Sequence, residues 1–224
     1  MSFTRARPRR RLVVESPNST RPSAPSPVPA PSTEVGRAMT IVGSDDGARP
    51  PGPGGEGENL SRELVCDLAS GMAAATSLWA PHVRYGPGHR PVRLVASDAW
   101  EAWIVGWSDG HRVERHDHGL SAGAIAVIDG ELTELRLDAG GVDRHRLVAG
   151  TVSWVPAGTV HELLASGRAA SLHVYSRPLS SITRYDPDGR PRSTDPVHAP
   201  DPVVDLRSAA RALHPTMAGG DDRG

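Results

Sequence analysis

The stretch that decides the fold runs from residue 110 to residue 130 and reads GHRVERHDHGLSAGAIAVIDG. His116 and His118 stand two residues apart, and mostly small and branched residues follow them as far as the Asp129-Gly130 pair. Because side chains alternate between the two faces of a strand, both histidines project to one side and Asp117 to the other. Two imidazoles on one strand face, with small neighbours, indicate a site that holds something between them.

Segments on both sides of this stretch repeat with the period of two that is typical of strands. The Asp129-Gly130 pair predicts a hairpin that joins strands at 122–128 and 131–137. Further short strands, separated by glycine or proline, are expected at 100–107, 151–155, 161–165 and 170–176. Many short strands without alternating helices favour a closed or sandwiched, mainly β domain.

The segment 60–79, LSRELVCDLASGMAAATSLW, has helical spacing instead. We expect one amphipathic helix there, capped by Asn59 or Ser61. If the helix has a break, we expect it at Gly71. The stripe that contains Leu64 and Met72 is expected to pack against the β domain.

Composition divides the chain into three parts. Residues 1–58 are rich in proline and arginine, and such a segment cannot bury enough apolar surface to offset the entropy of ordering, so we expect disorder. Residues 59–187 form the expected domain. Residues 188–224 return to proline, aspartate and arginine, so we expect a mostly flexible tail with a short helix at 203–213.

Charge and cysteine content exclude several classes of function. The formal net charge is -1, so no excess charge favours nucleic acid or an anionic membrane as a partner. All 25 basic residues are arginine, which excludes Schiff-base chemistry on a lysine. Cys66 is the only cysteine, which fits a reducing compartment, and no apolar run approaches the roughly 20 residues of a membrane helix. We expect a cytoplasmic protein with no obligate protein partner.

Two glycine-bounded frames occur in order along the chain. In the first, Gly110 is followed by five residues, His116-x-His118, four residues, Gly123, six residues and Gly130. In the second, Gly150 is followed by five residues, Pro156-x-Gly158, two residues and His161. The pair resembles the two motifs of the cupin superfamily, a small jelly-roll-like β-barrel. The resemblance implies that His116, His118 and His161 bind a metal ion.

One position departs from the general cupin pattern, because Gly123 stands where most cupins have a glutamate ligand. Strand alternation turns Asp117 and Glu162 away from the neighbouring histidines, so neither replaces that glutamate. The predicted site therefore consists of three neutral imidazoles, which leave the charge of a divalent metal uncompensated. Such a site favours an anionic bidentate ligand, and a thiolate suits Fe(II).

A three-histidine cupin followed by SLHVYSRP at 171–178 resembles the cysteine dioxygenase family. The resemblance implies an Fe(II) cofactor and the oxidation of L-cysteine by dioxygen to cysteine sulfinic acid. It also implies that Ser171, His173 and Tyr175 form a catalytic hydrogen-bonded relay. Their spacing of two residues places all three on one face of a strand, as a relay requires.

The family resemblance further implies an arginine that holds the substrate carboxylate, and Arg93 fits best, with Arg90 as a rival. Two alternatives stay open. A 3-mercaptopropionate or other small-thiol dioxygenase is one, although the type that oxidises 3-mercaptopropionate uses a glutamine and this chain contains none. A cupin that binds a metal or small ligand without turnover is the other.

Overall fold

The computed structural model of the chain describes residues 40–42, 58–86, 91–138 and 140–213. Within these residues the helices are α1 (Arg62–Ala74), α2 (Thr76–Trp79) and α3 (Leu206–Leu213). The first six strands are β1 (Thr40–Val42), β2 (Val92–Ala96), β3 (Trp100–Trp107), β4 (Arg112–Asp117), β5 (Ala122–Asp129) and β6 (Glu131–Asp138). The others are β7 (Gly141–Val148), β8 (Thr151–Val155), β9 (Val160–Ala165), β10 (Ala169–Ser176), β11 (Ser181–Tyr185) and β12 (Pro191–Pro196).

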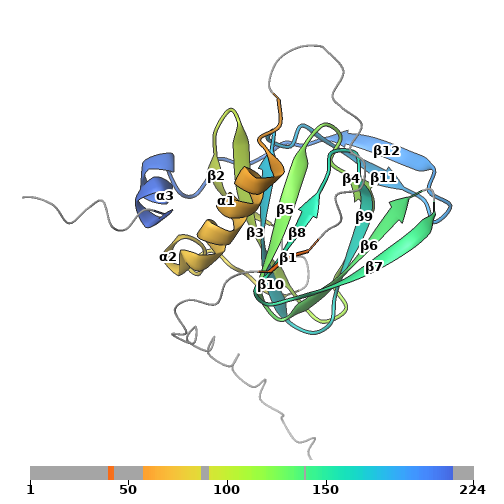
Figure 1. Cartoon of the computed structure of the whole chain (residues 1–224), viewed down its shortest axis with the longest axis horizontal. Helices are drawn as coiled ribbons and strands as arrows, with labels where there is room; N and C mark the ends of the chain where they lie inside the picture. Colours follow the sequence, from red (N-terminus) through yellow and green to blue (C-terminus); the bar gives the residue numbers. More distant parts are fainter. Residues whose placement is uncertain (1–39, 43–57, 87–90, 139, 214–224) are drawn as a thin grey trace, which may run out of the picture. The chain divides into compact units, whose positions relative to one another are not determined.

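The strands form two sheets that enclose the interior of a barrel (Figure 1). One sheet has the order β1-β8-β5-β10-β3-β2 and the other the order β12-β11-β4-β9-β6-β7. The short β1 runs parallel to β8, whereas the other pairs, such as β10 with β3 and β5, are antiparallel. The predicted mainly β, cupin-type barrel is confirmed.

The expected turn is present, but the predicted pairing across it is wrong. β5 and β6 lie in different sheets, where β5 pairs with β8 and β10 and β6 pairs with β7 and β9, so the turn connects the two sheets instead of closing a hairpin. β5 and β6 flank Gly130, whose φ of 72° lies in the left-handed region that favours glycine. A Cβ atom at this position would lie 2.3 Å from the backbone oxygen of Arg168, so the turn also needs glycine for space.

The helical segment differs from its prediction in where it breaks and in the exposure of Leu64. α1 continues past Gly71 and ends at Ala74, with Ala75 as its C-cap. At the other end, Ser61 caps it by accepting a hydrogen bond from the backbone N–H of Leu64. Leu64 is 46% exposed, while Val65 and its neighbours one and two turns later are buried. Met72 is buried as expected and Leu68 packs against the core, so Leu64 is the residue of the predicted stripe that turns outward.

The carboxyl-terminal part of the fold extends beyond the predicted boundary at 187. β12 pairs with β11, and the backbone N–H groups of Val203 and Val204 bond to the carbonyls of Arg93 and Leu94 on β2. α3 then packs Ala209 into the core. Residues 188–213 are therefore folded, contrary to the prediction of a mostly flexible tail, because main-chain hydrogen bonds hold a segment that has few apolar residues.

The predicted disorder of residues 1–58 falls largely outside the described residues. The described exceptions are Thr40–Val42, which form β1, and residue 58. Within the described residues, none of the helices is both long and apolar enough to cross a membrane.

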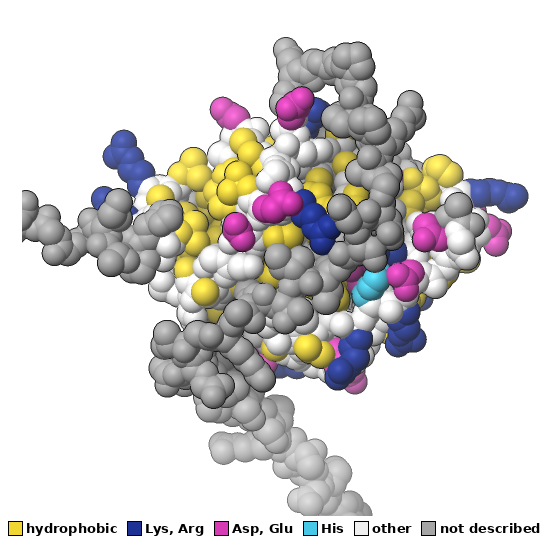
Figure 2. Space-filling model, in the orientation of Figure 1, with side chains coloured by type: hydrophobic (Ala, Val, Ile, Leu, Met, Phe, Trp, Pro, Cys, Tyr) yellow, Lys and Arg dark blue, Asp and Glu magenta, His cyan; other side chains and the backbone are white. Residues whose placement is uncertain are grey.

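Two apolar clusters support the barrel. The larger lies between the helices and the outer face of the β10 sheet and contains Cys66, Met72 and Leu172. The smaller fills one end of the barrel interior with residues such as Val127, Leu132 and Leu163. On the face drawn in Figure 2, the acidic and basic side chains of the described residues are scattered and form no single patch.

Candidate metal centre

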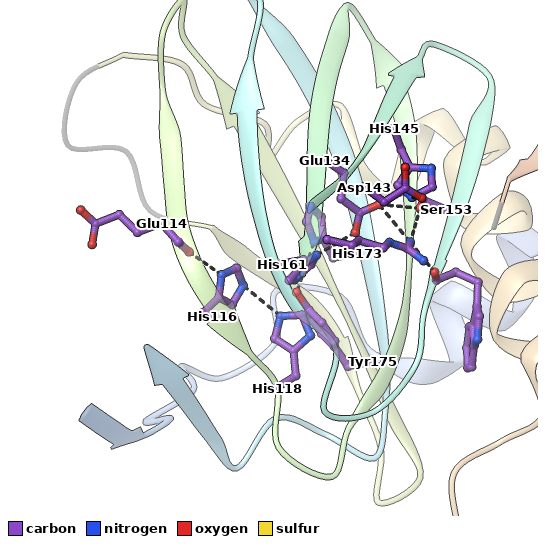
Figure 3. A network of polar contacts seen from close by, with 12 residues as sticks. Glu114, His116, His118, Glu134, Asp143, His145, Ser153, His161, His173 and Tyr175 are labelled. Carbon is purple, nitrogen blue, oxygen red and sulfur yellow. Dashed lines mark hydrogen bonds and ion pairs between the residues drawn. The ribbon is translucent and has the colours of Figure 1, made fainter. Parts of the chain in front are cut away.

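Three buried histidines converge inside the barrel. His116 lies on β4, His118 directly follows β4, and His161 lies on the neighbouring β9, opposite His116 in the register. The three side chains each offer a ligand atom, and these atoms lie within 4.8 Å of one another. Figure 3 shows the three imidazoles directed toward one another. The structure thus brings together the three predicted ligands in a group that can hold a metal ion.

Hydrogen bonds to the Nδ1 atoms of His116 and His161 determine that the Nε2 atom of each ring faces the group of three histidines. The Nδ1 atom of His116 lies 2.7 Å from the carbonyl oxygen of Glu114, and the Nδ1 atom of His161 lies 2.8 Å from Oε1 of Glu134. Each of these Nδ1 atoms therefore carries the proton of its ring, so the lone pair of Nε2 is free to bind a metal ion. The Nε2 atoms of His116 and His118 lie 3.1 Å apart.

The Nε2 atom of His161 is buried and has no hydrogen-bond partner among the described residues. A buried polar atom without a partner is costly, and a metal ion in contact with it would remove that cost. The unpartnered Nε2 atom of His161 lies where the imidazoles of His116 and His118 also converge, and this arrangement fits a bound metal ion. Imidazole donors suit iron, copper, nickel and zinc.

Glu134 on β6 holds His161 in place through a buried network. Its carboxylate is fully buried, and Oε2 accepts hydrogen bonds from Ser153 at 2.7 Å and from Arg136 at 3.0 Å. Burial alone would raise the pKa of Glu134, but its hydrogen bond and charge interaction with His161, together with Arg136, lower it to about 2. The ionised carboxylate orients the imidazole and makes it a better metal ligand.

Burial keeps His116 and His118 neutral. Burial first, and repulsion from His161 second, lower the pKa of His116 to about 3. The same two causes lower the pKa of His118 well below its usual value. Neutral imidazoles are the form that binds a metal ion.

The group of possible ligands among the described residues contains three histidines and no carboxylate. Asp117 accepts hydrogen bonds from Tyr185 and from the backbone N–H of Gly119, and Glu162 pairs with Arg112 at 2.8 Å. Both carboxylates are thus engaged away from the three imidazoles.

Gly123 packs directly against Tyr175, its neighbour in the β5–β10 register. A Cβ atom on Gly123 would lie 2.9 Å from the carbonyl oxygen of Val174 and 3.0 Å from Cδ1 of Tyr175. The tyrosine ring therefore occupies the space into which a longer side chain at this position would grow.

The predicted relay residues form a continuous buried chain on β10. Ser171 Oγ lies 2.8 Å from Nε2 of His173, and Nδ1 of His173 lies 3.2 Å from the hydroxyl of Tyr175. The ring of Tyr175 lies beside His118, with 4.8 Å between the ring centroids. Burial lowers the pKa of His173 to about 3 and raises the pKa of Tyr175 above its usual range.

Trp107 fixes the direction of this chain of hydrogen bonds. Its indole N–H donates to Ser171 Oγ at 2.9 Å, and an indole can only donate. The arrangement that satisfies every group has Ser171 donating to Nε2 of His173, and Nδ1 of His173 donating to the hydroxyl oxygen of Tyr175. The hydroxyl proton of Tyr175 is then left for a group in the cavity.

A cavity of about 190 Å³ adjoins the three histidines. This is smaller than the roughly 300–1,000 Å³ of sites for drug-sized ligands, so it suits a small molecule. Apart from the three histidines, His173 and Tyr175, its wall is apolar and includes Trp103, Val105, Leu163, Leu179, Ile182 and Val197.

Arg93 does not line this cavity. Its Nε and NH2 atoms lie 2.8 and 2.7 Å from Oε2 of Glu101, which is fully buried, and NH1 bonds to the carbonyl of Pro200. The guanidinium expected to hold a substrate carboxylate thus already holds a carboxylate of the protein. The rival Arg90 lies outside the described residues.

Sequence reasoning missed four residues that support the site: Trp107, Glu134, Arg136 and Ser153. Glu134 and Arg136 offered a signal, since two opposite charges two residues apart share one face of a strand. Trp107 offered none, because its bond to Ser171 depends on the pairing of β3 with β10.

A barrel of two sheets whose interior carries three converging, buried histidines defines a cupin-type protein with a candidate metal site. The model of the cysteine dioxygenase type I family matches residues 56–188, more than half of the chain, and the chain belongs to this family. Family and site together indicate an oxidoreductase that acts on a small molecule.

Other comparisons add only likeness of fold. A search of curated proteins finds no match. A double-stranded β-helix protein from Klebsiella pneumoniae is 19% identical with a TM-score of 0.42, and the match covers 47% of this chain and 86% of that one. A cupin superfamily protein from Desulfitobacterium hafniense is 20% identical with a TM-score of 0.40, covering 45% and 89%.

Proposed function

We propose that the protein is an Fe(II)-dependent thiol dioxygenase that converts a small thiol to the sulfinic acid. The reaction adds both atoms of dioxygen to sulfur, RSH + O2 → RSO2H, and balances without a further reductant. L-Cysteine is the first substrate to test, because the chain belongs to the cysteine dioxygenase type I family. A protein with this chemistry would act in the cytoplasm, where thiols stay reduced.

Three buried imidazoles without a carboxylate support this proposal. His116, His118 and His161 would hold the metal through Nε2 and add no negative charge to it. Fe(II) bound there would supply the redox chemistry that joins dioxygen to a thiolate. An anionic sulfur ligand would then offset part of the metal's charge.

The relay that ends at Tyr175 is the observation that carries the proposal. A protein that only binds a metal has no use for a buried proton donor beside it, yet Tyr175 lies next to His118 with its hydroxyl oriented by His173. Its raised pKa keeps the phenol protonated at neutral pH, so it can donate to oxygen or sulfur in the cavity.

The test is oxygen consumption by the full chain after loading with Fe(II), with L-cysteine, 3-mercaptopropionate and cysteamine as substrates. We expect uptake with at least one thiol, and a product whose mass exceeds that of the thiol by two oxygen atoms. The His161→Ala variant is the control, because it lacks one ligand. Absence of uptake with every small thiol would favour the alternative of a metal or ligand-binding cupin without turnover.

A further inference from the structure

His118 is held differently from the other two histidines of the metal centre. The Nδ1 atoms of His116 and His161 each lie within hydrogen-bond distance of an oxygen atom of the protein, at 2.7 and 2.8 Å. The Nδ1 atom of His118 has no such bond to a described residue, and its ring packs against Tyr175 instead. Because a metal-binding imidazole needs a fixed direction, the backbone of His118 must supply much of that direction.

The backbone of His118 lies where β4 ends and a tight turn begins. Its carbonyl oxygen accepts a hydrogen bond from the backbone N–H of Ser121 at 3.1 Å, which closes the turn. Oδ1 of Asp117 accepts a second hydrogen bond in the turn, from the backbone N–H of Gly119 at 2.8 Å. Since Asp117 precedes His118 and Gly119 follows it, this bond fixes the backbone on both sides of the ligand.

Asp117 is itself held by Tyr185 on the neighbouring strand. Its other oxygen atom, Oδ2, accepts a hydrogen bond from the hydroxyl of Tyr185, the last residue of β11. Asp117 is only 7% exposed, and a buried carboxylate needs hydrogen bonds to offset its lost hydration. Without the hydroxyl, Oδ2 would have no partner among the described residues, so the carboxylate would gain by turning toward water and away from Gly119.

β11 is a firm support for this bond because strands flank it on both sides. It pairs with β4, where Thr183 lies opposite Asp117, and with β12, where the hydroxyls of Thr183 and Thr194 lie 3.1 Å apart. Ile182 of the same strand lines the cavity. One strand thus carries both a part of the cavity wall and the hydroxyl that holds Asp117.

We infer that Tyr185 is a positioning residue of the metal centre, which keeps His118 in its metal-binding place through the carboxylate of Asp117. Tyr185 belongs neither to the group of possible ligands nor to the wall of the cavity, so its influence passes through Asp117. The inference rests on the proposed function for a metal ion at the three histidines, and it requires no oxidation step.

The Tyr185→Phe variant removes the hydroxyl and keeps the ring. We expect its affinity for Co²⁺, measured on the full chain by competition with a chelator, to fall about threefold to tenfold, which is less than the roughly 10–100-fold loss for a partner bonded to the ligand itself. Thr183→Val is the matched control, because it removes a side-chain hydrogen bond of the same strand, to Thr194, and leaves Asp117 untouched. Wild-type affinity in Tyr185→Phe, or an equal loss in Thr183→Val, would overturn the inference.

The visible spectrum of bound Co²⁺ separates the position of the ligands from the stability of the fold. The energy and intensity of its bands depend on the number and geometry of the ligands. At saturating Co²⁺ we expect altered bands in Tyr185→Phe and wild-type bands in Thr183→Val. A spectrum of Tyr185→Phe that superimposes on that of the wild type would refute the positioning role.

A double-mutant cycle tests whether Tyr185 acts through Asp117. We expect Asp117→Ala to lose at least as much Co²⁺ affinity as Tyr185→Phe, and the double variant to lose no more than Asp117→Ala alone, because the hydroxyl then has no carboxylate to hold. Losses that add in the double variant would show a different route and overturn the inference.

These measurements keep the inference separate from the proposed activity. A wild type that binds Co²⁺ and, loaded with Fe(II), oxidises no thiol would remove the proposed dioxygenase function, while a loss of Co²⁺ affinity in Tyr185→Phe would still support the positioning role. Oxygen uptake by the wild type together with unchanged Co²⁺ binding in Tyr185→Phe would remove the positioning role alone.

Discussion

Replacing Glu134 by glutamine should weaken metal binding without removing a metal ligand. The carboxylate accepts the Nδ1 proton of His161 at 2.8 Å and bonds to Ser153 and Arg136 on its other oxygen. Glutamine can keep one acceptor toward His161, but its NH2 group then faces the guanidinium of Arg136, and two donors meet. The positive charge of Arg136 is left without its buried partner.

The size of the effect follows from the bonds that change. Hydrogen bonds to charged groups contribute about 1.5–3 kcal/mol and neutral ones about 0.5–1.5 kcal/mol, so the His161 bond alone loses about 1 kcal/mol. Loss of such a bond behind a metal-binding histidine lowers metal affinity roughly 10–100-fold, which is about 1.4–2.8 kcal/mol. We expect the result to lie in this range, with the repulsion from Arg136 adding to the lost bond.

The assay is a competition titration against a fluorescent chelator, using the wild type and two variants. Glu162→Gln is the matched control, because Glu162 is also a buried carboxylate and follows His161 directly, yet it pairs with Arg112 and Arg115 on the opposite face. It should bind metal as the wild type does. Wild-type affinity in Glu134→Gln, or equal losses in both variants, would refute the reasoning.

Three further predictions concern the site itself. His161→Ala should fail to retain iron after desalting, because two histidines remain, and stoichiometric iron would contradict the ligand set. Tyr175→Phe should lower oxygen uptake roughly 10²–10⁴-fold while metal affinity stays unchanged, and full activity would exclude the phenol as a proton donor. Gly123→Ala should lower the free energy of unfolding in urea by about 1–3 kcal/mol, because its Cβ meets the backbone of Val174, and an unaltered midpoint would disprove this close packing.

The parts of the fold that sequence could predict are those set by local pattern. The alternation along β3 and β10 and the Asp129-Gly130 turn depend on neighbouring residues, and the structure has them where the pattern indicates. The helix break at Ala75 and the pairing of β12 with β11 depend instead on tertiary contacts. Gly71, the expected breakpoint, lies inside α1, where a Cβ atom would come within 3.1 Å of Leu213 on α3.

In the site, too, sequence predicts the features that follow from local pattern and misses those that depend on how distant strands pair. The spacing of His116, His118 and His161 implied a shared centre through the resemblance to a known family, and the structure brings the three together. The register shift between Val113 and His116, where β4 pairs with β9, cannot be predicted from the alternation of residues along β4. The pairing of Arg93 with Glu101 was likewise beyond prediction, because it requires the β2–β3 register.

The contact between Gly123 and Tyr175 has a consequence for how this fold can change. A glutamate at position 123 could reach the centre only through the volume that the phenol now fills, so a carboxylate ligand and the tyrosine compete for one place. A substitution toward the four-ligand arrangement of other cupins would therefore dismantle the relay at the same time. The side chain at one position of β5 thus decides between a fourth ligand and a proton donor.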